Sequence, residues 1–283
     1  IRDAQESRGL GDVYKRQGCA LANRLSADPK YSVALVEAGG KDTNPWIHIP
    51  VGYFKTMGNP KLDWRYNTQP DPGLSGREIP WPRGRVLGGS SSINGLLYVR
   101  GQAEDFNHWR QLGNTGWAWD DVLPYFKRAE TWNSDGKVDP VRGTEGPLSV
   151  SPTPLKRDIV DKWVEAAVAA GFRRNADYNG AEQEGVGYFQ LTVAKGRRCS
   201  SAKAYLKPAS NRKNLKIITD AQAEKILIQD GRAFGVTVNI RGQSQNIYAR
   251  REIVLSAGSI GSPQILMLSG IGAASELKKH GIN

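Results

Sequence analysis

The sequence predicts an α/β protein, α+β overall, with a parallel sheet and a separate antiparallel β-meander. A helix of small residues begins at Gly18 and leads into an apolar run over 31–40, and uninterrupted apolar runs are typical of strands buried on both faces of a parallel sheet. Several apolar runs between 214 and 249 are separated by turn residues, as in antiparallel hairpins. Near 143 a strand and a long helix interrupt this pattern.

Residues 1–17 do not fit the rest of the chain. They show no apolar periodicity and no apolar core of a signal peptide. Their last part, 11–17, resembles the translation of a sequencing-library adapter. We therefore interpret 1–17 as an adapter-derived scar and expect the native sequence to begin at Gly18.

The first helix and strand have the spacing of a dinucleotide-binding fold. Glu37 stands at the carboxyl end of the apolar run, 19 residues after Gly18, where such folds place an acidic residue that binds ribose hydroxyls. If Gly18 is the third glycine of the phosphate-binding fingerprint, the other two fall at Val13 and Lys15. The fingerprint is therefore missing, and we expect a first strand and phosphate loop to be absent from this chain.

A glycine- and serine-rich stretch over 84–106 is the centre of the functional interpretation. Its paired glycines and three serines permit a backbone that lies flat against a ligand and presents N–H groups and hydroxyls to it. The apolar run 96–99 indicates buried structure behind the loop. An ordinary surface loop is the alternative for such composition. The preceding segment, 41–80, is rich in proline, and we expect Trp46, Trp64 and Tyr66 to anchor it over the nucleotide.

The middle of the chain predicts further helices and strands. We expect a helix capped by Asp120, with Trp117 and Trp119 packed in the core rather than forming a sugar-stacking platform. Strands are predicted over 146–150 and 185–193, and a helix over 158–170. The apolar side of that helix is composed of Ile159, Val160, Trp163, Ala166, Ala167 and Ala170. Another helix begins after Arg198, with Ser200 or Ser201 as its cap, and Cys199 is expected to be buried and inert.

The last part of the chain predicts the meander and a return to the first sheet. Strands are expected over 215–219, 223–228, 233–240 and 246–249, with a tight turn at Asp230-Gly231. A parallel-type strand is expected over 252–258. A helix follows, with Pro263 near its start, where proline is tolerated, and Ser269-Gly270 at its end.

Composition and charge exclude several classes of function. The chain is 39% hydrophobic and 24% charged, as in soluble globular proteins, and no apolar run approaches the roughly 20 residues of an integral membrane segment. The net charge of +11 is scattered without a basic helix face, so we expect no nucleic-acid partner. Cys19 and Cys199 and three isolated histidines predict no metal site. Two distant cysteines favour a reducing compartment, and we expect a cytoplasmic protein, with peripheral membrane association as the alternative.

Two stretches, 84–106 and 258–272, resemble the two signatures of the glucose–methanol–choline (GMC) family of FAD-dependent oxidoreductases, and 196–206 resembles a segment of that family's substrate domain. The resemblance extends from Gly18 to Asn283. It implies a Rossmann-like FAD-binding domain with a β-meander and part of a substrate-binding domain. The expected division is 18–145 and 211–283 for the FAD-binding domain and 146–210 for the substrate-binding part, with the C-terminal part of the family fold missing.

The resemblance also implies the residues that hold the FAD cofactor. Gly18 is expected at the pyrophosphate, Glu37 at the adenosine ribose, Ala223 at the adenine, and Ala257 and Gly258 near the pyrophosphate and ribityl chain. The other expected cofactor-binding residues are Ala38, Gly39, Arg85, Val86, Leu87, Gly88, Gly89, Ser90, Ser91, Asn94, Gly95, Leu96 and Leu97.

The implied reaction is oxidation of the CH–OH group of an alcohol, with hydride transfer from the alcohol carbon to the flavin. The partners are then a small-molecule alcohol and an electron acceptor, which is a quinone, a dye-like acceptor or oxygen. The family's catalytic histidine is expected beyond Asn283, and His48, His108 and His280 do not match it. We therefore expect the 283-residue chain to bind flavin poorly and to be inactive. Alternatives are another GMC-type FAD enzyme, a lyase or fatty-acid photodecarboxylase, and a non-catalytic nucleotide-binding fragment.

Overall fold

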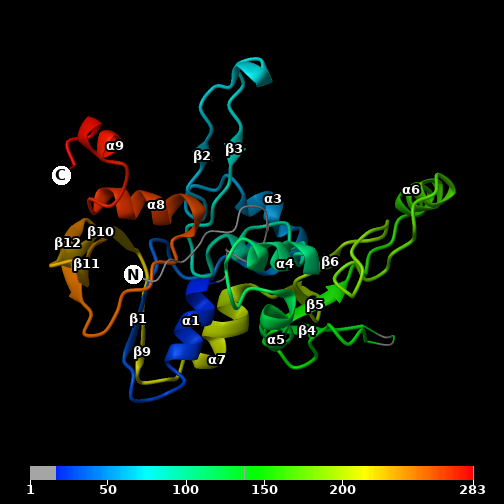
Figure 1. The fold of residues 1–283 in the computed structure, drawn as a ribbon, viewed down its shortest axis with the longest axis horizontal. Helices are drawn as coiled ribbons and strands as arrows, with labels where there is room; N and C mark the ends of the chain where they lie inside the picture. The colour runs from blue at the N-terminus through cyan, green and yellow to red at the C-terminus, as the bar shows by residue number, and fades with distance from the viewer. Residues whose placement is uncertain (1–16, 135, 137, 283) are drawn as a thin grey trace.

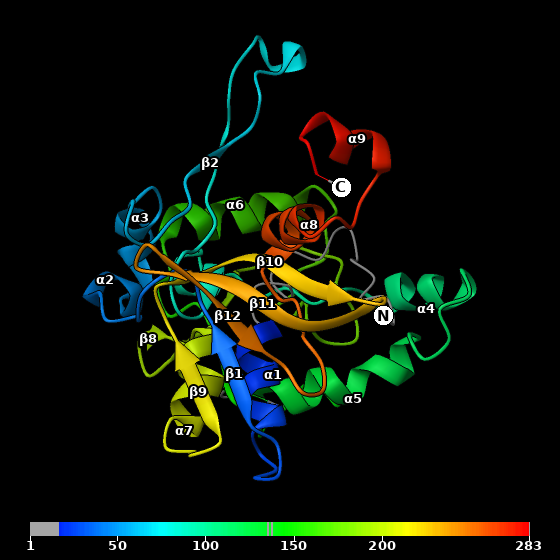
Figure 2. The same ribbon diagram turned by 90° about the vertical axis from the view of Figure 1, so that its left-hand side faces the viewer.

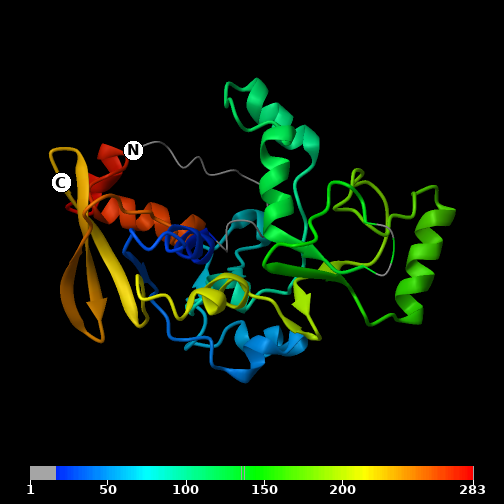
Figure 3. The ribbon, with the colours of Figure 1, turned by 90° about the horizontal axis from the view of Figure 1, so that it is seen from below.

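The computed structural model describes residues 17–134, 136 and 138–282. The predicted scar therefore lies outside the described residues, except for Gln17. The molecule is elongated, with the β-meander at one end and the long helix α6 (Asp158–Ala169) at the other (Figure 1, Figure 3). The predicted mixture of a parallel sheet, a meander and an interrupting segment is confirmed.

The parallel sheet joins two segments that are far apart in the chain. Helix α1 (Gln17–Leu25) precedes β1 (Val33–Val36), which pairs in parallel with β9 (Leu215–Ile218), and Figure 2 shows the two strands side by side. Burial on both faces of β1 was a wrong expectation, because Ala34 is exposed and the other three residues are half-buried. Among the described residues, β1 has β9 as its one paired neighbour.

The β-meander has the predicted strands and turn. It consists of β10 (Ala221–Gln229), β11 (Arg232–Ile240) and β12 (Gln243–Tyr248), paired antiparallel in that order. Asp230 and Gly231 both have positive φ, 49° and 73°, which a two-residue hairpin turn of type I′ requires. The meander packs against α8 (Gly258–Leu268) through the N–H of Ile226, which donates to Ser269 Oγ at 2.8 Å.

Two expectations for the last part of the chain are wrong. Residues 252–256 form no strand, and no described strand pairs with them. Pro263 lies inside α8 rather than at its start, because the helix already begins at Gly258. Ser269 and Gly270 end the helix as predicted, with Gly270 at a φ of 81°. Helix α9 (Ala274–Lys279) follows.

The proline-rich segment is composed of short elements and a protruding ribbon. Strands β2 (Tyr66–Asn67) and β3 (Pro80–Trp81) pair antiparallel and lead away from the body of the molecule (Figure 1). The rings of Trp64 and Tyr66 are stacked, with centroids 5.9 Å apart, but Trp46 is 44% exposed and does not anchor the segment. The other elements of the segment are α2 (Pro45–His48), η2 (Pro50–Gly52), α3 (Tyr53–Thr56) and η3 (Pro72–Leu74).

The interrupting segment forms small sheets with helices beside them. Strand β5 (Leu148–Pro152) pairs in parallel with β4 (Glu130–Trp132) and antiparallel with β6 (Gln190–Leu191). The predicted strand over 185–193 is thus reduced to β6 and β7, since 185–189 lie outside any strand. The other elements are α4 (Ala103–Gln111), α5 (Trp119–Ala129), β7 (Val193–Ala194), β8 (Arg197–Arg198), the π-helical turn η5 (Ala202–Leu206) and α7 (Lys207–Ala209).

Local details of these helices differ from expectation. The cap of α5 is Ala118, whose N–H donates to Asp121 Oδ2 at 3.0 Å, so Asp120 is not the cap. Trp117 is exposed and Trp119 half-buried, so core packing of Trp117 was wrong. In α6, Val164 is buried while Ile159 and Trp163 are exposed. The Oγ of Ser200 accepts from the N–H of Lys203 and caps the turn, as one of the two predicted caps.

The main core lies where the two parts of the chain meet. Cys19 and Ala22 of α1 pack with Trp132, Val150 and residues of η5, and Cys199 is buried among them as expected. Tyr98 also belongs to this cluster and Leu87 packs against it, so both ends of the loop 84–98 contact the core formed by the first helix and the interrupting segment.

Candidate functional site

The loop 84–98 is held in place by close backbone contacts at its glycines. A Cβ on Gly84 would lie 2.3 Å from the carbonyl oxygen of Gly89, so only glycine fits there. Gly88 has a φ of 91° and precedes the short 3-10 helix η4 (Gly89–Ser92), where Ser91 and Ser92 are buried. The loop is therefore a compact, backbone-lined structure rather than an open surface loop.

All three serine hydroxyls of the loop are engaged inside the protein. Ser90 Oγ accepts from the N–H of Gly84 at 3.0 Å, and Ser92 Oγ donates to the carbonyl of Leu87 at 2.8 Å. Ser91 Oγ donates to the carbonyl of Gly88 at 2.6 Å and accepts from the N–H of Ser201 at 2.9 Å. The hydroxyls shape the loop, and we expect the loop to meet a ligand mainly through its backbone.

The two segments predicted to bind the nucleotide cross each other directly. A Cβ on Gly39 would lie 2.0 Å from the carbonyl oxygen of Arg85. Gly40 and Val86 form a parallel bridge, in which the N–H of Leu87 donates to the carbonyl of Gly40 at 2.9 Å. Gly39 and Arg85, which are 46 positions apart, thereby come into contact. Both are predicted to bind the same cofactor, which requires that they lie close together.

The carboxylate of Glu37 lies at this crossing. The side-chain Oε1 accepts from the N–H of Gly39 at 2.9 Å, and the backbone carbonyl of Glu37 accepts from the N–H of Ala221 at 3.0 Å. Burial raises the pKa of Glu37 from 4.5 to about 7, opposed by the Gly39 hydrogen bond and by the charge of Arg85. A carboxylate with acceptor capacity at the end of β1 suits a pair of ribose hydroxyls.

The raised pKa of Glu37 predicts a pH dependence of stability. Between pH 4.5 and 7, Glu37 keeps its proton in the folded protein but has released it in the unfolded chain. The free energy of unfolding therefore falls as the pH rises from 4.5 through 7. Glu37→Gln should therefore stabilise the protein at pH 8 by on the order of 2 kcal/mol, allowing for partial exposure, and leave it unchanged at pH 4. Denaturant unfolding at both pH values measures this. Equal gains at both would contradict it.

A cavity of about 620 Å³ opens beside the crossing. Three of its lining residues, Ala38, Gly39 and Arg85, belong to the predicted set. Lys41 and Lys61 add two further basic side chains, and Asp220 is the single acid in the lining. The Nε of Arg85 is buried without a hydrogen-bond partner among the described residues, while its guanidinium lies 5.0 Å from the ring centroid of Trp64. A basic cavity with an unsatisfied donor and a neighbouring carboxylate fits a nucleotide diphosphate.

The second half of the loop turns toward the interrupting segment. Leu96 has a φ of 66° and is buried, and its carbonyl accepts from the N–H of Thr192 at 2.9 Å. Leu97 is 40% exposed, so the apolar run is only alternately buried. Asn94 Oδ1 accepts from the N–H of Leu96 and from Arg198. Positive φ at a buried leucine is backbone strain that the surrounding contacts maintain.

The remaining predicted residues lie on elements next to this site. Gly18 lies near the 252–258 segment, since its Cβ would be 3.5 Å from that of Ser256. Ala257 and Gly258 form the start of α8, and Gly258 has a φ of 86°. Ala223 lies at a bulge of β10, two residues beyond Ala221, which bonds to Glu37. Roles in cofactor binding stay predictions for all these residues.

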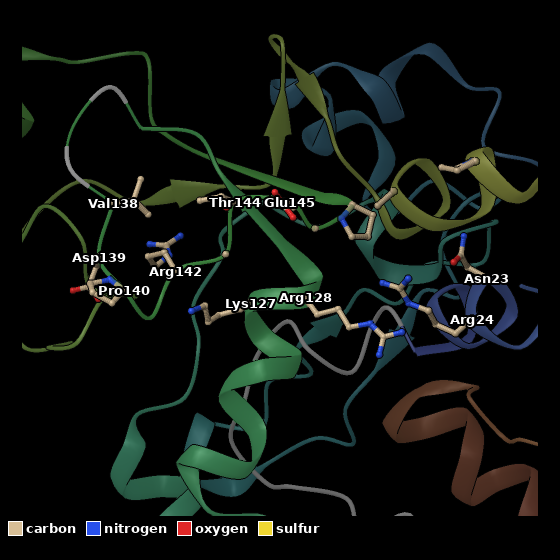
Figure 4. A pocket seen from close by; sticks show the side chains of 15 residues that line it. Asn23, Arg24, Lys127, Arg128, Val138, Asp139, Pro140, Arg142, Thr144 and Glu145 are labelled. Atoms are coloured by element: carbon tan, nitrogen blue, oxygen red, sulfur yellow. The ribbon is translucent and has the colours of Figure 1, made fainter.

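A larger cavity, of about 800 Å³, contains none of the predicted cofactor residues. It lies between α1, the end of α5 and the loop 138–147, with Arg24, Lys127 and Arg128 around it (Figure 4). Basic residues in the last turn of α1 and α5 are also favourable to the helix dipoles. Cavity size alone therefore does not identify the nucleotide site.

Sequence reasoning missed several residues at the site. Lys41, Lys61 and Asp220 line the smaller cavity, and Ser201 and Arg198 bond to the loop from another part of the chain. The segment 196–206 was noticed for its family resemblance, and that was the available signal for Arg198 and Ser201. No pattern in the sequence indicates the other three, because they are brought to the cavity by folding.

Other kinds of site were also considered. No group of histidine, cysteine, aspartate or glutamate within the described residues is arranged to hold a metal ion. His48 Nε2 is 2.8 Å from the carbonyl oxygen of Asp42. None of the helices in the part of the chain that the structure describes combines the length and apolar character that a membrane crossing needs.

Comparison with known proteins gives a consistent result. The family model described as GMC oxidoreductase matches residues 13–282. The chain is 50% identical over 266 residues to an oxygen-dependent choline dehydrogenase of Sinorhizobium fredii, covering 94% of this chain and 48% of that protein. A protein of the same name from Brucella anthropi is 48% identical over 265 residues, with the same coverage. The chain thus spans about half the length of the curated relatives it matches.

Solved structures agree with the fold. Pyridoxine 4-oxidase from Mesorbium loti superposes with a TM-score of 0.88 at 35% identity, covering 95% of this chain and 52% of that one. A variant of Aspergillus oryzae RIB40 formate oxidase, described for its FAD modification, superposes with a TM-score of 0.83 at 31% identity, covering 94% and 48%. These similarities confirm the α+β fold expected from the sequence.

Proposed function

Since this chain belongs to the GMC oxidoreductase family, we propose that it binds FAD and belongs to an enzyme that oxidises the CH–OH group of a small alcohol. When bound, FAD supplies the acceptor for the hydride of the alcohol carbon. The role of the residues described here is to bind and orient that cofactor. The relatives named for choline and pyridoxine support an alcohol as the substrate class.

The crossing of Gly39 over Arg85 and Val86 is the observation that supports this proposal. Gly39, whose N–H donates to the Glu37 carboxylate, and Arg85 of the glycine-rich loop line the same basic cavity. Glu37 would accept from the ribose hydroxyls, and Arg85 would donate its unsatisfied Nε–H to a phosphate oxygen. Lys41 and Lys61 add positive charge on the same side.

We expect Arg85→Met to weaken FAD binding about tenfold or more, because hydrogen bonds to a charged group contribute on the order of 1.5–3 kcal/mol. The measurement is a titration of the protein expressed from its complete reading frame with FAD, followed by quenching of flavin fluorescence. Arg83→Met is the matched control, because Arg83 lies two residues away and contacts the carbonyl of Pro82 and the ring of Trp81. Equal losses in both variants would contradict the assignment.

Alcohol oxidation is tested by adding choline or pyridoxine without oxygen to the flavin-loaded protein expressed from its complete reading frame. Bleaching of the flavin absorbance supports an alcohol oxidoreductase. A flavin that binds but is not bleached by any alcohol would favour another FAD reaction of the family, and absence of flavin binding would favour a non-catalytic fragment. Repeating the reaction with oxygen, a quinone and a dye identifies the electron acceptor.

A further inference from the structure

Arg198 is a buried arginine at the end of a short hairpin from the interrupting segment. Strands β7 and β8 pair Val193 with Arg198, and the two turn residues, Lys195 and Gly196, both have positive φ. This two-residue turn fixes the register of the hairpin. The side chain of Arg198 then points into the protein and is 1% exposed.

The guanidinium of Arg198 bonds to two segments that are distant from it in the sequence. Its Nε donates to the carbonyl of Ile47 at 2.7 Å. Its Nη1 donates to Asn94 Oδ1 at 2.7 Å and to the carbonyl of Ser91 at 3.2 Å. Two of the three acceptors belong to residues predicted to bind the cofactor.

The residue that precedes this hairpin, Thr192, contacts the loop at a second point. The N–H and the hydroxyl of Thr192 both donate to the carbonyl of Leu96, at 2.9 and 3.2 Å. Since Asn94 Oδ1 also accepts from the N–H of Leu96, the amide of Asn94 is held from both sides. The left-handed backbone at Leu96 is maintained by these contacts.

We infer that Arg198 is a positioning residue for the cofactor loop. It fixes the peptide of Ser91 and the amide of Asn94 in the geometry in which the loop receives the flavin part of FAD. The contacts themselves are independent of any ligand, while their purpose rests on the proposed function. A lysine cannot replace this residue, because its single ammonium lacks the planar fork that spans three acceptors.

Arg142 provides a matched control elsewhere in the protein. It is also buried, and its side chain bonds to Glu130, Asp177 and Gln190, none of which is a predicted cofactor residue. Arg142→Lys and Arg198→Lys therefore remove the same kind of buried fork from two places. A general loss of stability should appear in both variants, whereas a change in the geometry of the cofactor loop should appear only in Arg198→Lys.

The first test is amide hydrogen exchange of the chain without ligand. We expect Arg198→Lys to increase hydrogen exchange of the backbone N–H groups of Asn94 and Leu96 about tenfold. Arg142→Lys should leave their exchange rates near those of the wild type. Asn94→Asp offers a carboxylate to the same guanidinium and should keep the loop protected. Equal exchange in the two lysine variants, or loss of protection in Asn94→Asp, would overturn the inference. The Asn94→Asp result stands even if Arg198→Lys fails to fold.

The second test is FAD affinity in a double-mutant cycle. Arg198→Lys should raise the dissociation constant about tenfold in the wild-type background and clearly less when Asn94 is already replaced by alanine, because only the bonds to Ser91 and Ile47 then remain to be lost. Additive effects would overturn the inference. FAD affinity is measured on the protein expressed from its complete reading frame. If that protein with the wild-type sequence binds no FAD, the proposed function fails, and hydrogen exchange still decides the role of Arg198.

Discussion

Gly39→Ala is expected to be among the most damaging single-methyl substitutions in this chain. The added Cβ would lie 2.0 Å from the carbonyl oxygen of Arg85 and 2.4 Å from the N of Val86, both backbone atoms. The two segments would have to separate, which would break the hydrogen bond from the N–H of Leu87 to the carbonyl of Gly40. We expect a loss of on the order of 3 kcal/mol and loss of FAD binding.

Gly40→Ala is the matched control for this substitution. The nearest atom to its added Cβ is Asp220 Oδ1 at 3.5 Å, an ordinary contact. Denaturant unfolding followed by circular dichroism should therefore show a large decrease in midpoint for Gly39→Ala and a small one for Gly40→Ala. Similar midpoints for the two variants would mean that the crossing is not as close as described.

Glu130→Ala is expected to have the second large effect, because Glu130 neutralises buried cations. Its Oε1 lies 2.8 Å from Arg142 Nε and 3.0 Å from Arg100 Nη2, and the carboxylate is fully buried. Removing it leaves two buried guanidinium groups, of which Arg142 retains an ion pair with Asp177. Breaking a buried ion pair from one side costs about 3–5 kcal/mol.

Two further variants separate this effect from a general loss of contacts. Glu130→Gln retains the shape and one hydrogen-bond acceptor and should cost less than Glu130→Ala. Glu165→Ala removes an ion pair to Lys162 in which both side chains are largely exposed, and should leave the unfolding midpoint unchanged. If Glu130→Ala were as mild as Glu165→Ala, the buried network would contribute little to stability.

The buried polar residues around Arg142 also connect the end of the loop 84–98 to the interrupting segment. The carbonyl of Tyr98 accepts from Tyr178 Oη at 2.9 Å and from Asn179 Nδ2 at 3.0 Å. Asn179 Nδ2 in turn donates to Gln190 Oε1, which also accepts from Arg142. The end of the loop is thus bonded to a hydrogen-bonded polar cluster, while Arg198 bonds to the middle of the loop.

The sequence by itself determined the local elements and the two segments that form the site. Asp230-Gly231 specified a hairpin because few other residue pairs adopt positive φ at both positions. The spacing from Gly18 to Glu37 specified a helix followed by a strand of a nucleotide-binding fold. Such features depend on residues close in the chain, so a pattern within a few positions is sufficient to reveal them.

Only the tertiary structure decided which side chains serve the site and which serve the scaffold. Ser90, Ser91 and Ser92 were expected to face a ligand, but their hydroxyls bond within the protein because Gly84, Leu87 and Ser201 come within reach on folding. Ile159 and Trp163 were expected on a packed face, yet Val164 is the buried residue of α6. Arg198 and Asp220 reach the site from more than a hundred residues away. Contacts of this range depend on how the elements pack, and no local pattern encodes them.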